Sequence, residues 1–401
     1  MPSGILQLLA TSDKDVYLTE NPTISFFEYK MFRYLNFSND LYKLSLNETA
    51  AFNTSTSIKI PKYGHLLSKF NLHISLPPLI KTSGTYANWS DTIGYSIFSK
   101  PIELLIGGVV VDHFWPVAAD MLDELNTSSN KLGHDQMIGK GDMYRSSLYN
   151  AIKTLDLMIP IDFWFTKHYS MALPLVSMTS QDIELRFSFN KFSDVINYDG
   201  PTPPYQVDII DSNLFTEYIF LDDIILQEFQ KQKHQYIIKQ TVFNGNETIP
   251  EKTLIYNTKL NFINPCQEIL FACVDSNNIS NNNYFNYSRS IDSEPLIKQV
   301  SLLLDGKHRY DNYLPEFIFR QFFPNNTHDR IPDKHQYIMP FSLQPNAHQP
   351  TGSINLGRFD DVTISLQMNT NNPACNLYIF GIMLNVLTIE NGIAKFEWMN
   401  V

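Results

Sequence analysis

The sequence predicts an all-β protein built from two similar sandwich-like domains in tandem. The first observation behind this prediction is a motif that the chain contains twice. Residues 103–112 read E-L-L-I-G-G-V-V-V-D, and residues 301–311 read S-L-L-L-D-G-K-H-R-Y-D. In both, an apolar run leads into a two-residue step, Gly107-Gly108 or Asp305-Gly306, of the kind that closes tight hairpins. Each half of the chain therefore carries a strand, a tight turn and a second strand.

The second observation is a pair of segments in which apolar and polar residues alternate strictly. They are residues 182–190 (D-I-E-L-R-F-S-F-N) and 361–369 (D-V-T-I-S-L-Q-M-N), and each follows the hairpin motif of its own half. Strict alternation is typical of a strand with one buried face. The composition agrees, since aromatic residues make up 13% of the chain, with 28 Phe and 21 Tyr. The shared order of the motifs indicates a duplicated β domain.

The elements of the first half follow one another in a clear order. Residues 1–24 precede the first strand pattern and form an arm, in which Asn21-Pro22 disfavours a helix. Strand-like segments, separated by turn signals, then recur: residues 25–34, 57–60, 70–76 and 103–111. Three more close the domain after a helix and a long polar loop: residues 157–165, 173–177 and 182–190.

One amphipathic helix is predicted over residues 116–125. Val117, Met121 and Leu125 recur at intervals of four residues, so they would share the face that packs on the core. The acidic residues of the segment fall largely on the other face, where we expect them to be solvated: Asp120, Asp123 and Glu124. A polar loop follows, from residue 126 to about residue 145.

The densest cluster of turn residues, N-Y-D-G-P-T-P-P at 197–204, places the domain boundary shortly after it. We therefore expect a first domain over residues 25–210 and a second over residues 211–401. The second domain repeats the plan with these features: a strand over residues 215–227, polar loops at 276–286 and 324–334, and a final apolar run at 377–389. That final run would be a strand buried on both faces.

The composition also limits the classes of function. The formal net charge is −11, whereas a protein that neutralises phosphates needs a dense Lys/Arg surface. The most basic stretch, residues 231–239, reads as a solvated loop or an edge strand. Three cysteines form neither a disulfide framework nor a zinc site and favour a reducing compartment. We therefore expect no direct nucleic-acid partner and no cofactor.

The opening M-P-S-G-I-L-Q-L-L-A lacks the basic segment of a signal peptide. No apolar stretch reaches the roughly 18 residues of a membrane-spanning helix. Asn-x-Ser/Thr sequences occur by chance in so Asn-rich a chain, among them those at Asn36, Asn47, Asn88 and Asn246. We therefore expect a soluble protein that is intracellular when made.

Residues that could suggest chemistry have simpler interpretations. Three histidines lack the spacing that aims metal ligands at one point, and we expect them in loops: His328, His335 and His348. Asp222 and Asp223 are adjacent, so on a strand they would point to opposite faces and could not flank a glycosidic bond. Gly139-Lys140-Gly141 is too short for a phosphate loop. The sequence therefore predicts neither an enzyme nor a metal site.

Several stretches occur in an order that is typical of a known family. They are Q-L-L-A at residues 7–10, D-V-Y-L-T-E-N-P at 15–22, I-S-F-F at 24–27, I-E-L-L-I-G-G at 102–108, A-L-P-L at 172–175 and H-Q-P-T-G-S-I-N at 348–355. In these residues the chain resembles the double jelly-roll major capsid proteins of nucleocytoplasmic large DNA viruses, or a close capsid paralogue. The resemblance extends from residue 7 to about residue 390.

The resemblance implies an all-β fold of two consecutive eight-stranded jelly rolls with short helices in the loops. It also implies a homotrimer, in which three chains supply six similar sandwiches and so form a pseudo-hexagonal capsomer of an icosahedral shell. Such a protein is part of the virion and is made in the host cytoplasm, at viral factories. Its implied partners are neighbouring capsomers, minor capsid proteins and the internal membrane layer.

The resemblance further places the arm, with its apolar patch at Ile5, Leu6, Leu8 and Leu9, on the inner side of the shell. The loops at 126–145 and 324–334 would then face outward. Jelly rolls also serve as lectins, so a carbohydrate-binding or carbohydrate-active β-sandwich protein is the alternative. Against it, the chain has no plausible pair of acidic residues and no calcium loop of the D-x-D-x-D-G type.

Overall fold

The computed structural model describes residues 3–127, 132–140, 153–310 and 312–398. The chain divides into two compact units, Met1–Asn36 and Phe37–Val401. The first unit contains two short helices, α1 (Ser3–Leu9) and α2 (Asp13–Thr19). Among the described residues, no strand precedes β1 (Phe37–Ser45), so the strand expected over residues 25–34 is wrong. Aromatic residues favour a strand only where a partner strand completes the ladder, and this segment has none.

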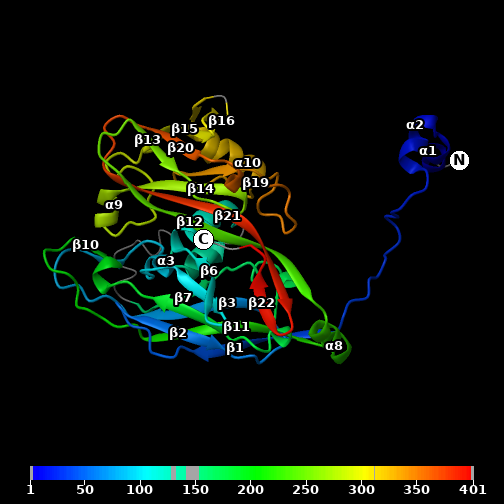
Figure 1. Ribbon diagram of the computed structural model, residues 1–401, viewed down its shortest axis with the longest axis horizontal. Helices are drawn as coiled ribbons and strands as arrows, with labels where there is room; N and C mark the ends of the chain where they lie inside the picture. Colours follow the sequence, from blue (N-terminus) through cyan, green and yellow to red (C-terminus); the bar gives the residue numbers. More distant parts are fainter. Residues whose placement is uncertain (1–2, 128–131, 141–152, 311, 399–401) are drawn as a thin grey trace. The chain divides into compact units, whose positions relative to one another are not determined.

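The second unit contains two sandwiches of antiparallel strands (Figure 1). In the first sandwich, one sheet has the order β1-β11-β3-β7 and the other the order β2-β9-β5-β6. Their bounds after β1 are β2 (Ser55–Ile60), β3 (Leu66–Leu76), β5 (Ile102–Ile106), β6 (Val109–Phe114), β7 (Leu155–Pro160), β9 (Ile183–Ser188) and β11 (Asp211–Leu221). β8 (Leu173–Pro174) adds to β3, and β4 (Ala87–Trp89) pairs with β10 (Ile196–Tyr198).

The second sandwich has sheets in the orders β12-β21-β14-β18 and β13-β20-β15-β16. Their bounds are β12 (His234–Ile249), β13 (Ile255–Lys259), β14 (Pro265–Asp275), β15 (Ile297–Leu304), β16 (Lys307–His308), β18 (Gln336–Pro340), β20 (Val362–Met368) and β21 (Cys375–Glu390). Three short strands extend these sheets: β17 (Leu314–Pro315), β19 (Ile354–Asn355) and β22 (Ile393–Phe396).

The two sandwiches have the same strand order, because the first, eighth, third and sixth of their eight main strands form one sheet in both. This arrangement confirms the predicted all-β fold of two eight-stranded sandwiches. The alternation of apolar and polar residues along a strand explains which of its faces packs into the sandwich. On β9, Ile183, Leu185 and Phe187 are fully buried, while the residues between them face outward or are half-buried.

The boundary predicted between residues 210 and 211 needs a correction. β11 begins at Asp211 and pairs with β1 along its whole length, from Ser45 opposite Asn213 to Phe37 opposite Leu221. β11 also pairs with β3, so it is an inner strand of the first sandwich. The turn cluster at 197–204 marks the connection between two strands of one sandwich, since turn residues follow any strand and do not distinguish a loop from a linker.

Short helices occupy the connections between strands, as the fold prediction expected. They are α3 (Ile93–Ser96), α4 (Pro116–Asn126), α5 (Leu132–Met137), α8 (Asp223–Lys231), α9 (Ser276–Ser280), α10 (Phe323–Thr327) and a π-helical turn η4 (Ile318–Phe322). Single turns of 3₁₀ helix lie at Tyr169–Met171, Leu175–Ser177, Phe192–Asp194 and Leu356–Arg358. The strand expected over residues 215–227 ends at Leu221, because Asp222 caps the start of α8 by accepting a hydrogen bond from the Asp223 N–H.

The sheet that contains β14 and β21 is buried on both faces. On β14, Ile269, Phe271 and Cys273 belong to the core of the second sandwich. The alternate residues Leu270 and Ala272 pack into the core that includes the first sandwich. Figure 1 shows this sheet lying between the first sandwich and the other sheet of the second. The apolar run at residues 377–389 belongs to this layer, which is why it lacks polar alternation.

Candidate functional site

The two sandwiches meet along a seam, by which we mean the residues of β12, β21, β14 and the second-sandwich loops that contact α4, β6 and the neighbouring loops of the first sandwich. Its apolar part is a group of rings. Trp115 lies 4.8 Å from Phe243 and 5.9 Å from Phe380, measured between ring centroids. Beside them, the Gln240 side chain donates a 2.7 Å hydrogen bond to the Val111 carbonyl oxygen. Edge strand β12 is thus attached to the first sandwich by both apolar and polar contacts.

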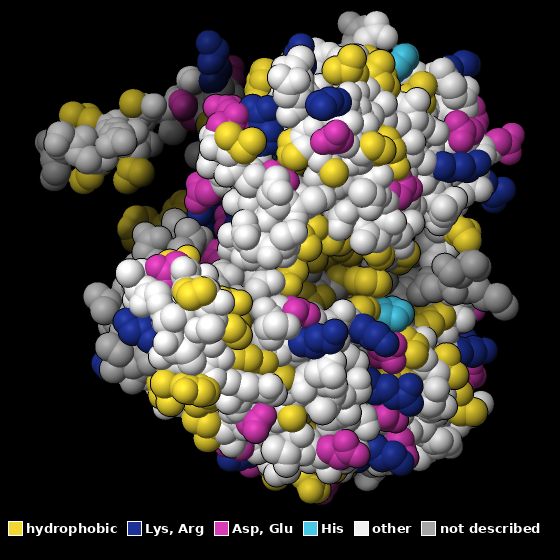
Figure 2. Space-filling view, turned by 90° about the vertical axis from the view of Figure 1, so that its left-hand side faces the viewer, with side chains coloured by type: hydrophobic (Ala, Val, Ile, Leu, Met, Phe, Trp, Pro, Cys, Tyr) yellow, Lys and Arg dark blue, Asp and Glu magenta, His cyan; other side chains and the backbone are white. Residues whose placement is uncertain are grey.

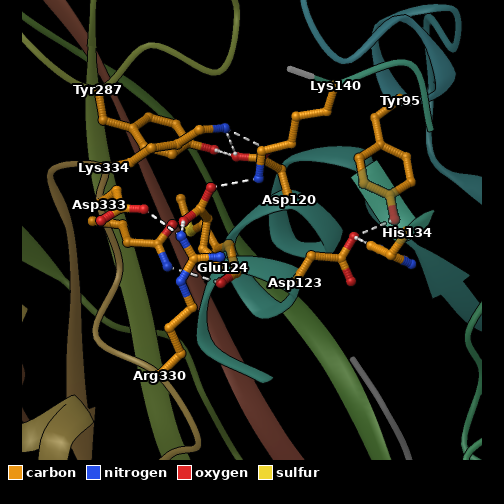
Figure 3. A network of polar contacts seen from close by, with 12 residues as sticks. Tyr95, Asp120, Asp123, Glu124, His134, Lys140, Tyr287, Arg330, Asp333 and Lys334 are labelled. Carbon is orange, nitrogen blue, oxygen red and sulfur yellow. Dashed lines mark hydrogen bonds and ion pairs between the residues drawn. The ribbon is translucent and has the colours of Figure 1, made fainter. Parts of the chain in front are cut away.

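A buried carboxylate lies at the centre of the polar part of the seam (Figure 3). Asp120 on α4 is 0% exposed. Its two oxygens accept hydrogen bonds from the Lys334 ammonium at 2.6 and 2.8 Å, and one also accepts from the Tyr287 hydroxyl at 2.8 Å. Burial raises the pKa of Asp120 above its ordinary value, although Lys334 and Lys140 oppose the shift. Asp120 belongs to the first sandwich and both of its hydrogen-bond donors to the second.

One turn further along α4, Glu124 forms a second buried ion cluster. Its side chain bonds to the Lys140 ammonium, and its other oxygen lies 3.8 Å from the Arg330 guanidinium. Burial alone would raise the pKa of Glu124, but Lys140, Lys334 and Arg330 together lower it. Arg330 also pairs with Asp333, and its backbone N–H donates to the Leu125 carbonyl at the end of α4. Helix α4 is therefore held by the loop that precedes β18.

The outer side of α4 carries a third polar group. Asp123 accepts hydrogen bonds from the Tyr95 hydroxyl at 2.5 Å and pairs with His134 Nε2 at 3.0 Å. Its hydrogen bond to Asp123 raises the pKa of His134, against the effect of burial. Burial and the charge of Asp123 raise the pKa of Tyr95 well above its ordinary value. These contacts fix α3, α4 and α5 to one another within the first sandwich.

The carboxylates of α4 therefore correct a prediction from the sequence, which placed them on a solvated face. Asp120 and Glu124 are four residues apart and form a stripe next to that of Met121 and Leu125, so all four are buried. Their cations come from residues 140, 330 and 334. In the sequence, Lys140 stands out only because it lies between two glycines, Gly139 and Gly141. That pattern does not indicate which carboxylate Lys140 pairs with.

The remaining predicted residues are not among those that form the seam network. Gly107 and Gly108 link β5 to β6 with φ of 61° and 81°, and Asp305 and Gly306 link β15 to β16 with φ of 48° and 77°. Ile5, Leu6, Leu8 and Leu9 are exposed on α1, in the first unit.

The histidines expected in loops have different surroundings. His328 lies outside the helices and strands, as expected, but its side chain is buried, with Nε2 3.1 Å from Glu268. The exposed His348 stacks on His168, with ring centroids 4.3 Å apart. His335 contacts the Ser293 carbonyl oxygen. Within the described part of the chain, no three His, Cys, Asp or Glu residues form a group that could hold a metal ion. None of the helices in that part is long and apolar enough to cross a membrane.

The polar contacts of the seam attach the two sandwiches to each other. The buried carboxylates Asp120 and Glu124 each have cationic partners outside α4, and some of these pairs join residues far apart in the sequence, such as Asp120 and Lys334. Further bonds across the seam run from Gln336 to the Met121 carbonyl oxygen and between Gln181 and Ala394. The arrangement fixes two sandwiches as a single block.

The chain matches two protein-family models in succession. Residues 25–222 match the model described as "Major capsid protein N-terminus", and residues 226–395 match "Large eukaryotic DNA virus major capsid protein". The chain is 26% identical to the major capsid protein of Pyramimonas orientalis virus over the whole length of both chains. It is 25% identical to that of Paramecium bursaria Chlorella virus 1, covering 92% of this chain and 88% of the relative.

Solved structures show the same fold. A chain of the PBCV-1 virus capsid superposes with a TM-score of 0.79 at 20% identity, covering 94% of this chain and 100% of that one. The Faustovirus major capsid protein gives a TM-score of 0.76 at 14% identity, covering 95% and 94%. The boundary between the two family models, at residues 222–226, falls where β11 ends and α8 begins.

Proposed function

Because the chain belongs to the major capsid protein family of large eukaryotic DNA viruses, we propose that it forms a homotrimer that acts as a pseudo-hexagonal capsomer of an icosahedral shell. Capsid proteins of this family are structural components of the virion and not enzymes.

The observation that carries the proposal is the pair of sandwiches with identical strand order, fixed to each other by the seam. Three such chains around a threefold axis present six similar sandwiches, so a threefold molecule can fill a sixfold position in a lattice. That geometry requires each chain to act as one rigid block. The buried Asp120–Lys334 pair and the ring group around Trp115 supply such rigidity.

Further parts of the proposal concern partners and orientation. We propose that the shell is formed by contacts with neighbouring capsomers and minor capsid proteins, and that the arm acts on the inner side of the shell, next to the internal membrane layer. The loop at 324–334 and the described part of the loop at 126–145 would then face outward. Both loops supply cations to the carboxylates of α4 in the network of Figure 3, which supports placing them at one end of the block. We also propose synthesis in the host cytoplasm, at viral factories.

The oligomeric state is the direct test. We expect sedimentation equilibrium at micromolar concentration to give three times the chain mass of 46.3 kDa. The physical reason is that obligate interfaces typically bury on the order of 2,000 Å² or more and therefore persist at such dilution. A protein that sediments as a monomer under these conditions would contradict the proposed capsomer, whatever its fold.

A further inference from the structure

A cleft with a volume of about 710 Å³ lies between loops of the two sandwiches. One wall is formed by residues 86–91 and by Asn197, from the β4 and β10 region of the first sandwich. The other wall is formed by residues between 283 and 293, which follow α9, and by Lys334. Figure 2 views the molecule from the side on which α9 and β10 lie, and it shows the surface hollowed between the two sandwiches.

The lining of this cleft combines amide groups with aromatic rings. Its amides come from both sandwiches: Asn88, Asn197, Asn283 and Asn286. Its rings are those of Tyr86, Trp89 and Phe285, of which Trp89 and Phe285 are nearly buried and Tyr86 is half-buried. Ser288, Ser293 and the carboxylate of Asp91 complete the polar lining. Amides and hydroxyls can each donate and accept hydrogen bonds, so such a surface suits a ligand with many hydroxyl groups.

The charge of the lining argues against an anionic ligand. Among the described residues that line the cleft, Lys334 is the only one with a basic side chain. Its ammonium is held by both oxygens of Asp120, so its charge is already compensated. A phosphate, sulfate or carboxylate would therefore meet no free cation and would face the carboxylate of Asp91.

The walls are held in place before any ligand binds. Asn282 bridges the two sandwiches, because its amide donates 2.8 Å hydrogen bonds to the carbonyl oxygens of Ser193 and Ile196. Asn278 donates to the Asn286 and Ser288 carbonyl oxygens, and the Asn286 side chain accepts from the Ser288 N–H and hydroxyl. A site that is ordered in advance loses less entropy on binding.

We propose that this cleft binds a neutral carbohydrate. A sugar ring presents C–H groups that pack on an aromatic ring and hydroxyls that bond to amides, which are the two kinds of surface found here. The volume lies within the range of about 300–1,000 Å³ that is usual for small-molecule sites. The inference rests on the proposed function in one respect: Lys334 belongs to the loop that we propose faces outward, so the cleft would meet the surface of the host cell.

The test uses the purified full-length protein and a panel of neutral sugars, namely glucose, galactose, mannose, fucose and N-acetylglucosamine, with sialic acid as the anionic probe. Saturation-transfer NMR and titration calorimetry measure binding. We expect saturable binding of at least one neutral sugar, and none of sialic acid. Tyr86→Ala and Asn283→Ala should each weaken it about tenfold, the equivalent of one lost contact worth about 1.4 kcal/mol. Both positions line the cleft, and Tyr86 makes no ring contact to another aromatic residue in the described structure.

Tyr198→Ala is the matched control, since Tyr198 lies on β10 opposite Ala87 but does not line the cleft. It should bind as the unaltered protein does, and melting curves should show all three variants folded. The inference would be overturned if none of the neutral sugars bound saturably. It would also be overturned if Tyr198→Ala and Tyr86→Ala weakened sugar binding to the same extent. Sedimentation of the same samples separates the two proposals: a trimer that binds no sugar refutes only the cleft, whereas a monomer that binds sugar refutes only the capsomer.

Discussion

The buried carboxylate of Asp120 stabilises the seam through its ion pair with Lys334. Lys334→Met leaves this carboxylate with one fewer cation and removes a hydrogen-bonded partner on the other sandwich. Breaking a buried pair from one side typically costs about 3–5 kcal/mol, because the remaining charge stays desolvated. With Lys140 and Tyr287 still nearby, we expect the free energy of unfolding to fall by about 3 kcal/mol in urea denaturation at fixed protein concentration.

The control for this prediction is Lys259→Met. Lys259 pairs with Asp361 at 3.6 Å, and both side chains are more than half exposed, so the loss should stay within about 0.5 kcal/mol. The double change Asp120→Asn with Lys334→Met should recover part of the loss, because it removes the unpaired charge. Equal effects of Lys334→Met and Lys259→Met would contradict the role assigned to the buried pair.

The stacked histidines give the seam a dependence on pH. Ser170 bridges the rings, since its hydroxyl lies 2.7 Å from His168 Nδ1 and 3.0 Å from His348 Nε2. The Ser170 backbone N–H also donates to His168 Nδ1, at 3.2 Å. Partial burial and the positive charges that His168 and Lys239 can carry lower the pKa of His348 from its ordinary value of 6.5. The stacked arrangement therefore favours the uncharged form of His348.

The sign of the pH effect follows from this lowered pKa. When the two rings are separated, His348 takes up a proton near its ordinary pKa of 6.5, whereas in the stack its pKa is lower. The contact is therefore stable above pH 6.5 and is lost as the pH falls below that value. The charge that acts on His348 from a neighbouring element is that of Lys239 on β12, which itself interacts with Lys167 and Glu268. Burial also lowers the pKa of Lys239, to about 8, but its ammonium still bonds the Pro345 and Ala347 carbonyl oxygens.

We therefore expect hydrogen exchange of residues 344–349, corrected for the intrinsic rate, to accelerate between pH 7.5 and pH 5.5. The comparison is with His168→Gln, which removes the ring that stacks on His348 and should flatten the change. His73→Gln, in the β3–β7 sheet beside Asp156, should leave it intact. Exchange that shows the same pH response in all three proteins would exclude the stack as its cause.

At the scale of elements, the two hairpins test the turn assignments. A Cβ added at Gly306 would meet no atom within 4 Å, so the only obstacle to a side chain there is its φ of +77°. Gly306→Val should cost about 1–3 kcal/mol and lower the melting temperature and the yield of trimer. Lys307→Val changes the next residue, which is exposed at the start of β16, and should have little effect. Indistinguishable melting curves for the two variants would contradict the turn geometry.

Elements with a strong local signal could be predicted from the sequence, and those that depend on distant partners could not. The alternating segments at 182–190 and 361–369 contain β9 and β20, and the helix predicted over 116–125 is α4. By contrast, residues 25–34 have strand-like composition without a partner strand. The seam network joins residue 120 to residues 287 and 334, and no periodicity relates positions so far apart.

At the scale of the whole molecule, the sheet β12-β21-β14-β18 serves two cores. One face of β14 packs in the second sandwich, while Leu270, Ala272 and Val274 pack in the core shared with the first. Separating the sandwiches would expose that second face to water, so the seam is part of the folded core and not a docking contact between independent domains. Stability and the fixed relation between the sandwiches therefore have the same physical origin.

The arm at residues 1–24, unlike the seam, has exposed apolar side chains. No residue of α1 is buried, and its apolar side chains are between 44% and 78% exposed: Ile5, Leu6, Leu8 and Leu9. All strands of the described residues lie in Phe37–Val401, so deletion of residues 1–20 should leave the melting curve, the protease-resistant core and the trimer unchanged. Shell assembly should be impaired, because the deletion removes exposed apolar side chains whose burial against partners would stabilise the shell. Leu8→Ser with Leu9→Ser keeps the arm's length and should reproduce part of the defect in electron micrographs of assembled particles. Normal particles from the truncated protein would remove the arm from the assembly mechanism.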